Sequence, residues 1–126
     1  MIKVEGILKD CSQTILAIGD TMEVLSGRWK MSIIACLCYQ PMRYSELLKQ
    51  VHGISGKMLS RELKDLEMND LIERNVLNTA PIAVEYRITV YGQSLKRLTE
   101  QIAEWGIQHR QRIIQNMKNS ITISDQ

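Results

Sequence analysis

Aromatic side chains are scarce in this chain, and phenylalanine is absent. Only 5% of the 126 residues are aromatic, although 44% are hydrophobic, so leucine, isoleucine and methionine must fill the core. The N-terminal stretch "MIKVEGILKDCSQ" lacks the apolar run of a signal peptide, and no segment approaches the roughly 18 apolar residues of a membrane helix. We therefore expect a cytosolic (cytoplasmic) protein, and the length suits one domain.

Cysteines are also few, and their spacing does not favour a metal site. Cys11, Cys36 and Cys38 form no CxxC pair, and His52 and His109 are the only histidines that could join them. A structural zinc site normally needs four well-spaced ligands, and a reducing compartment does not favour a disulfide framework. The sequence therefore predicts neither a metal nor a cofactor.

Charge of one sign is not in large excess, but it is unevenly distributed. The formal net charge is only +2, which is too small for a protein that coats nucleic acid through bulk charge. Residues 43–64, however, hold five basic residues against two acidic ones, an excess of three. If the protein binds DNA, we expect the surface formed by residues 43–64 to carry the positive charge that contacts it.

Apolar spacing, glycines and the two prolines divide the chain into helices and strands. The expected helices are 10–26, 28–40, 44–51, 55–68 and 91–117, and the expected strands are 42–44, 71–77 and 83–89. Ser55 is the expected N-cap of the fourth helix, and Asn78 and Pro81 suit a turn between the last two strands. This order predicts a mainly α (α+β) fold, a winged helix-turn-helix with N- and C-terminal dimerisation helices.

Residues 1–126 are expected to form a single winged-helix domain with its core at 27–90. The helices 10–26 and 91–117 carry heptad-like apolar seams, more than a domain of this size needs, so we expect them to pair in a homodimer. The expected interface residues are Ile15, Ile18, Met22, Leu95, Leu98, Ile102 and Trp105. The alternative is that the last helix packs only on its own domain. The polar tail 118–126 is expected to be flexible.

The helix at 55–68 has two different faces. Leucines recur at i, i+4 and i+7 from Leu59 and can pack inward, whereas Lys57, Arg61 and Lys64 have the same spacing on the opposite side. Such a basic face is typical of a helix that enters the major groove of DNA. The alternative is an ordinary solvated face, since Glu62 and Asp65 interleave with the basic residues.

The hairpin and the turn before the helix favour DNA binding over that alternative. Gly56 and Ser60 are small and would let the backbone approach a partner, and the hairpin tip at 78–82 could reach the DNA backbone or minor groove. The expected partner is double-stranded DNA with a palindromic operator. The residues expected at this interface are Arg43, Ser45, Ser55, Gly56, Lys57, Ser60, Arg61, Lys64, Arg74, Asn78, Thr79 and Arg87.

Several blocks of the chain resemble one family. They are "LSGRWKMSII", "RYSELLKQVHGISGKMLSRELKDLEMNDLIER", "VEYRITVYGQSL" and "EWG". Over roughly residues 11–106 the chain is similar to the HxlR-type winged helix-turn-helix transcriptional regulators. The resemblance implies a dimeric, sequence-specific DNA-binding regulator, which we expect to be a repressor and not an enzyme. In that case the helix after Ser55 is the reading element and 78–82 the tip of the wing.

Some members of this family carry a cysteine near the N-terminus that senses oxidants or electrophiles. Cys11 is the candidate here, although it lies farther from Trp29 than the family pattern, which puts Ile15 or Leu16 at that place. Cys11 could equally be a small apolar residue at an interface. Two other functions stay open: a winged-helix module that binds protein, and, less favoured, a thiol-dependent enzyme that uses Cys11. No other residue is a candidate for catalysis.

Overall fold

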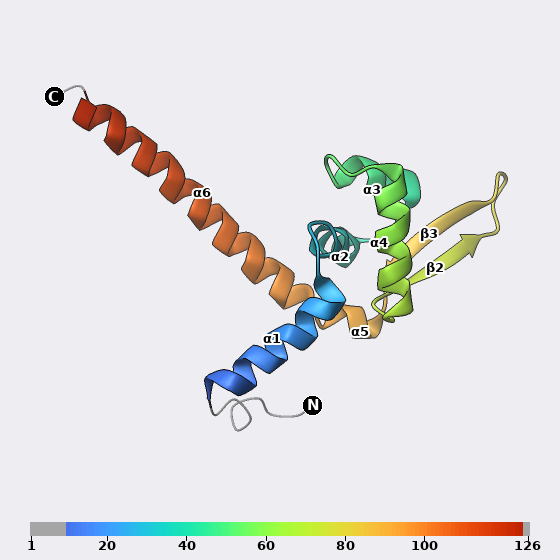
Figure 1. Ribbon diagram of the computed structural model, residues 1–126. Coiled ribbons are helices and arrows are strands. Elements are labelled where there is room, and N and C mark those ends of the chain that lie inside the picture. Colours follow the sequence, from blue (N-terminus) through green and yellow to red (C-terminus); the bar gives the residue numbers. More distant parts are fainter. Residues whose placement is uncertain (1–9, 125–126) are drawn as a thin grey trace.

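The computed structural model describes residues 10–124, so residues 1–9 of the expected domain and the last two residues of the expected tail lie outside the described part. Within residues 10–124, six helices and three strands follow one another in nearly the expected order (Figure 1). They are α1 (Cys11–Leu25), α2 (Lys30–Tyr39), β1 (Met42–Arg43), α3 (Tyr44–Gln50), α4 (Gly56–Met68), β2 (Ile72–Leu77), β3 (Ala83–Ile88), α5 (Val90–Gln93) and α6 (Lys96–Ser124).

The three strands form one antiparallel sheet in the order β1-β3-β2. The β2–β3 hairpin runs out to one side of the helices, while α6 projects to the other side (Figure 1). The helix pair α3 and α4 lies between them, and Ser55 caps α4 as expected, because its Oγ accepts a hydrogen bond of 3.1 Å from the Met58 N–H. The arrangement confirms the mainly α winged helix-turn-helix fold that the sequence predicts.

The core is built from aliphatic side chains, as the scarcity of aromatics requires. The inward-facing leucines of α4 are buried against isoleucines of α2 and β2. The fully buried side chains are Ile33, Ile34, Leu37, Leu47, Leu59, Leu63, Leu66, Leu71 and Ile72. Because every helix of the helix-turn-helix supplies one of them, burial of this cluster fixes α4 against α2 and α3.

A buried ion pair joins α2 to α4. The Lys30 Nζ lies 2.6 Å from the Glu62 Oε2, and both residues are buried. The carboxylate of Asp65, one turn further along α4, lies 3.4 Å from the same ammonium. A charge that is buried without a partner is costly, so the two carboxylates hold Lys30, and with it the start of α2, against the middle of α4.

One long helix from 91 to 117 was expected, but this prediction was wrong, because the chain breaks between α5 and α6. Thr89 caps α5 by accepting a hydrogen bond from the Gly92 N–H, and its hydroxyl donates to the Asp70 carbonyl. At Gly92 the backbone packs against Leu71 so closely that a Cβ would overlap the Leu71 carbonyl oxygen. This contact holds the short helix α5 against Leu71, and the chain leaves it before α6 begins at Lys96.

The C-terminal end of α6 also differs from expectation. The segment expected to leave the helix at residue 118 continues it to Ser124. No proline or glycine follows Gly106, and the apolar residues Ile113, Met117 and Ile121 keep helical spacing beyond residue 117. Within residues 10–124, none of the helices is long and apolar enough to cross a membrane.

Replacing Glu62 with glutamine is expected to destabilise the fold. The substitution Glu62→Gln keeps the shape of the side chain but leaves the buried Lys30 ammonium with Asp65 as its remaining carboxylate partner. We expect a loss of about 2 kcal/mol in the free energy of unfolding, measured by urea denaturation at fixed protein concentration. The control Glu67→Gln alters an exposed residue of the same helix and should stay within about 0.5 kcal/mol of wild type. Equal stability of both variants would contradict this role of the ion pair.

Candidate nucleic-acid interface

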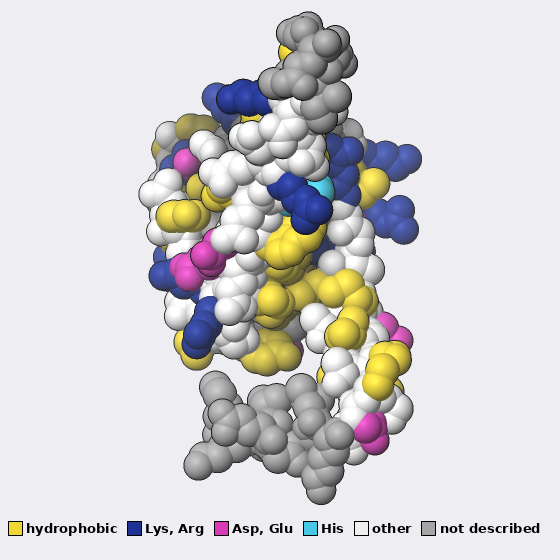
Figure 2. All heavy atoms as spheres, turned by 90° about the vertical axis from the view of Figure 1, so that its left-hand side faces the viewer, with side chains coloured by type: hydrophobic (Ala, Val, Ile, Leu, Met, Phe, Trp, Pro, Cys, Tyr) yellow, Lys and Arg dark blue, Asp and Glu magenta, His cyan; other side chains and the backbone are white. Residues whose placement is uncertain are grey.

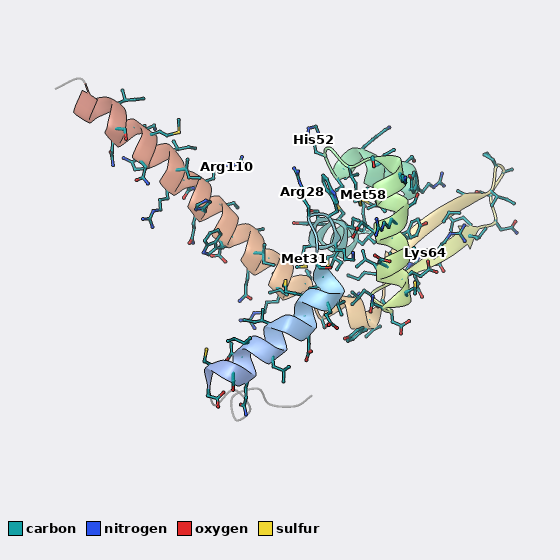
Figure 3. The ribbon with its side chains drawn as sticks, viewed as in Figure 1. Arg28, Met31, His52, Met58, Lys64 and Arg110 are labelled. Carbon is teal, nitrogen blue, oxygen red and sulfur yellow. The ribbon has the colours of Figure 1, made fainter. Side chains whose placement is uncertain are left out.

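The exposed face of α4 carries the three basic residues that the sequence places there. Lys57, Arg61 and Lys64 are all exposed, whereas Leu59 and Leu63 on the opposite face are buried. Figure 3 shows Lys64 on the side of α4 near the β2–β3 hairpin. The three cationic side chains therefore form one basic face along the helix, which we call the α4 basic face.

The α4 basic face is less neutralised by acidic residues than its sequence indicates. We expected Glu62 and Asp65 to weaken it, but Glu62 points inward to Lys30 and is buried, and Asp65 is half-buried beside the same ammonium. The sequence interpretation of Glu62 as a surface residue was wrong, because its partner lies 32 residues away in the chain. Lys30 therefore neutralises one of these two negative charges, that of the buried Glu62, and Asp65 is the acidic side chain of the pair that stays partly exposed.

Tyr44 was not singled out from the sequence, yet it joins the first turn of α3 to the first turn of α4. Its hydroxyl donates a hydrogen bond of 2.7 Å to the Gly56 carbonyl and accepts one of 3.3 Å from the Ser60 Oγ. A Cβ at Gly56 would lie 3.0 Å from this hydroxyl. The absence of a side chain at Gly56 thus leaves room for the Tyr44 hydroxyl, and its expected role in the approach of a partner stays a prediction. The sequence signal for this contact was the pair of small residues Gly56 and Ser60, four positions apart on one face of α4.

The residues expected to flank α4 are accessible at its N-terminal side. Arg43 and Ser45 are exposed at the start of α3, where the Arg43 N–H donates to the Glu46 Oε1 at 3.0 Å. Ser55 is exposed, and its oxygen is used in capping α4. The hydroxyl of Ser55 keeps its proton free as a donor to an external acceptor.

Register separates the two arginines near the base of the hairpin. Arg74 pairs with Tyr86 and Glu73 pairs with Arg87, and neighbouring residues on a strand point to opposite faces. Arg74 therefore shares a face with buried Ile72, the face toward the helices. The guanidinium of Arg87 lies on the other face, 3.4 Å from the Glu85 carboxylate.

The tip of the hairpin is exposed, as expected for a wing. Asn78 and Thr79 are both accessible. The Thr79 hydroxyl donates a hydrogen bond of 2.7 Å to the Pro81 carbonyl, and the Ala80–Pro81 peptide is cis. The tip is a turn at the far end of the hairpin (Figure 1).

Two apolar helix faces remain uncovered in the single chain. Ile15, Ile18, Met22, Ile102 and Trp105 are each about half or more exposed, Trp105 by 66%. Ile18, Met22 and Ile102 border a groove of about 360 Å³ between α1 and α6, and Figure 2 shows hydrophobic side chains gathered over both helices.

The residues around the start of α6 behave differently from those further along the helix. Leu95 and Leu98 are half-buried and pack against the core of their own domain, whereas Trp105 stacks on His109 at 5.0 Å, with both rings on the exposed part of α6. The start of the last helix therefore packs on the core of its own domain, whereas Trp105 further along the helix is largely exposed.

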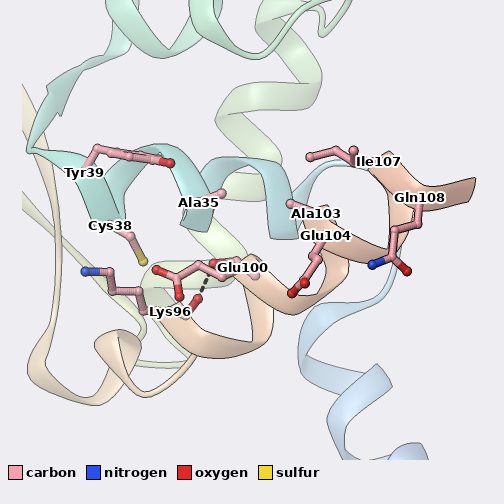
Figure 4. A pocket seen from close by; sticks show the side chains of 10 residues that line it. Ala35, Cys38, Tyr39, Lys96, Glu100, Ala103, Glu104, Ile107 and Gln108 are labelled. Carbon is pink, nitrogen blue, oxygen red and sulfur yellow. Dashed lines mark hydrogen bonds between the residues drawn. The ribbon is translucent and has the colours of Figure 1, made fainter. Parts of the chain in front are cut away.

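The three cysteines are free thiols in different settings. Cys11 is exposed at the first residue of α1. Burial raises the pKa of the Cys36 thiol, and burial also raises that of Cys38, which lines a pocket of about 590 Å³ between α2 and α6 with Lys96 and Glu100 (Figure 4). In the part of the chain that the structure describes, no cluster of three or more His, Cys, Asp or Glu side chains could hold a metal ion.

Similar proteins share this fold and sequence. The uncharacterised HTH-type transcriptional regulator YtcD of Bacillus subtilis (strain 168) is 36% identical over 98 residues, 78% of each chain, and its crystal structure superimposes with a TM-score of 0.70 over 75% of this chain and 96% of the other. The uncharacterised HTH-type transcriptional regulator BH0655 of Halalkalibacterium halodurans is 35% identical over 111 residues, 87% of this chain and 96% of that protein.

A further solved structure extends the comparison. The redox regulator HypR in its reduced form is 27% identical, with a TM-score of 0.72 over 79% of this chain and 98% of that one. YtcD and BH0655 are named transcriptional regulators and not enzymes, and HypR is named a redox regulator. The family model of the HxlR-like helix-turn-helix matches residues 24–114, which include the helix-turn-helix, the hairpin and α6 as far as residue 114. The chain belongs to the HxlR-like helix-turn-helix family.

Proposed function

We propose that the protein is a sequence-specific DNA-binding transcriptional regulator that binds an inverted-repeat operator as a homodimer and represses transcription. The observation that carries the proposal is the α4 basic face, where Lys57, Arg61 and Lys64 are exposed while Glu62 is turned inward to Lys30. A helix of this kind fits the major groove, in which basic side chains can contact both base edges and flanking phosphates.

The hairpin supports the same mode of binding. With α4 in the major groove, a wing that projects beside it can reach the neighbouring backbone or minor groove. Arg74 lies on the face of the hairpin toward the helices and no ion pair engages it within the described residues. We therefore assign phosphate binding to Arg74 and to the exposed tip at Asn78 and Thr79, and not to Arg87.

The uncovered apolar faces of α1 and α6 support a homodimer. Ile18 and Met22 on α1 lie across the groove from Ile102 on α6, while Ile15 on α1 and Trp105 on α6 are exposed outside it. A second copy would bury these side chains and so gain apolar burial that the single chain leaves unused. The dimer presents two α4 helices to the DNA. A dimer bound to a promoter would prevent other proteins from binding there, and we therefore favour repression.

Cys11 is the candidate for an input signal. Its exposed thiol stands at the first residue of α1, next to the apolar face that we assign to the dimer. The related HypR is named a redox regulator. We therefore propose that modification of Cys11 by an oxidant or electrophile alters the pairing of α1 and lowers DNA affinity. The raised pKa of Cys36 and Cys38 leaves less thiolate at neutral pH and makes them slower to react.

The first test is the binding of purified protein to DNA from upstream of its own gene. Fluorescence anisotropy should show a preference for this duplex over a scrambled one, and an affinity that falls steeply with salt. Arg61→Ala should weaken operator binding by about 1–3 kcal/mol if Arg61 contacts a guanine, with a smaller loss on scrambled DNA. The control Arg97→Ala removes the same charge from the first turn of α6 and should bind like wild type.

Either of two results would count against this assignment. Equal operator affinity of Arg61→Ala and wild type would remove Arg61 from the interface. Binding of a protein partner that is insensitive to salt, with no DNA preference at any salt concentration, would favour a protein-interaction module.

The two arginines of the hairpin should differ in the same titration. We expect Arg74→Ala to weaken binding to all sequences alike, by about 3- to 10-fold at low salt, because a phosphate contact carries no sequence information. Arg87→Ala should change affinity by less than about 2-fold, since its side chain pairs with Glu85 on the outer face. A larger loss for Arg87→Ala than for Arg74→Ala would contradict the orientation of the wing.

Treatment with diamide, a thiol oxidant, tests the role of Cys11. We expect the operator affinity of wild type to fall after treatment and to recover with a thiol reductant, while Cys11→Ser keeps its affinity throughout. The matched variant Cys36→Ser should respond like wild type, because its half-buried thiol has a raised pKa. An identical loss in Cys11→Ser and wild type would assign the response to another group.

A further inference from the structure

A cationic side chain outside the helix-turn-helix is held next to the start of α4. Arg28 precedes α2 and is exposed, and its guanidinium carbon lies 4.7 Å from the centroid of the Trp29 ring. Among the described residues, no carboxylate forms an ion pair with Arg28. Stacking on an aromatic ring orients a guanidinium without using its N–H donors.

The Trp29 ring is itself fixed against the turn between α3 and α4. A Cβ at Gly53 would lie 3.7 Å from the Trp29 Cη2, and Trp29 is half-buried against the core. Gly53 lies two residues before Ser55, the N-cap of α4. In Figure 3, Arg28 and His52 lie at the same edge of the molecule, and Met58 marks the first turn of α4 beside them. The stacked guanidinium of Arg28 is therefore held near the N-terminal end of α4, the end that we expect to enter the major groove.

We propose that Arg28 binds a backbone phosphate of the DNA and, together with the α4 basic face, fixes how deeply and in which register α4 is seated. This inference rests on the proposed function. It adds to the interface a residue from the segment before α2, a part of the chain to which the sequence assigned no DNA contact.

The choice of phosphate over a base follows from geometry and chemistry. A helix fills most of the width of the major groove, roughly 12 Å, so a side chain that stands beside its N-terminal end meets the backbone that borders the groove. A planar guanidinium can hold a phosphate through two parallel N–H donors. Because Trp29 already restricts the side chain, little conformational entropy remains to be lost on binding.

Salt-dependent anisotropy titrations on the upstream and scrambled duplexes test the assignment. Arg28→Gln removes the charge and leaves a shorter, neutral planar group, and Arg28→Lys keeps the charge. We expect Arg28→Gln to weaken binding to both duplexes by a similar factor, about 5- to 10-fold at low salt, and to reduce the slope of log affinity against log salt by about 2 for the dimer. Arg28→Lys should keep most of the slope, and Arg97→Ala should match wild type.

The outcomes separate this inference from the proposed function. Wild-type affinity and slope in Arg28→Gln, with an intact operator preference, would overturn the phosphate contact and leave the proposed function standing. Loss of operator preference without a change in slope would also overturn it, since Arg28 would then act on a base or through α4. If wild type binds both duplexes equally, the operator part of the proposed function fails, while the slope of Arg28→Gln still decides the contact. If wild type binds neither duplex, both fail together.

Discussion

The buried ion pair between Lys30 and Glu62 has consequences both on α4 and at the start of α2. On α4 it draws an acidic side chain out of the surface and leaves Lys57, Arg61 and Lys64 exposed on one face. At the start of α2 it fixes the turn that carries Arg28 and Trp29, which lies against Gly53. The helix α2 also packs on α6 and borders a pocket with it. It therefore connects α4 to α6, the helix that we assign to the dimer.

The elements and their order could be predicted from the sequence because their signals are local. Helical spacing of leucines, the N-cap at Ser55 and the turn residues after Leu77 act over a few positions, and all three are found where expected. The break before α6 could not be predicted in this way. It depends on the contact of Gly92 with the Leu71 carbonyl. These two residues are far apart in the sequence, and the spacing of apolar residues within one helix carries no information about such a contact.

For the candidate interface too, features that depend on local sequence could be predicted, and features that depend on contacts between distant segments could not. That the basic residues of α4 are exposed follows from the helical period, and the structure agrees. The inward turn of Glu62, the hydrogen bond from Tyr44 to Gly56 and the stacking of Arg28 beside the α3–α4 turn all need the fold, because they bring together different helices or loops. The opposite orientation of Arg74 and Arg87 needs the register of the hairpin, which composition does not specify.

The central claim is that two copies of the chain present their α4 basic faces to successive turns of one DNA duplex. Hydroxyl-radical footprinting of the protein on its own upstream DNA tests this most directly. The account predicts two protected windows related by a dyad, with centres about one helical turn of 10 base pairs, or a whole multiple of it, apart. A single protected window at saturating protein, or uniform protection without windows, would contradict it.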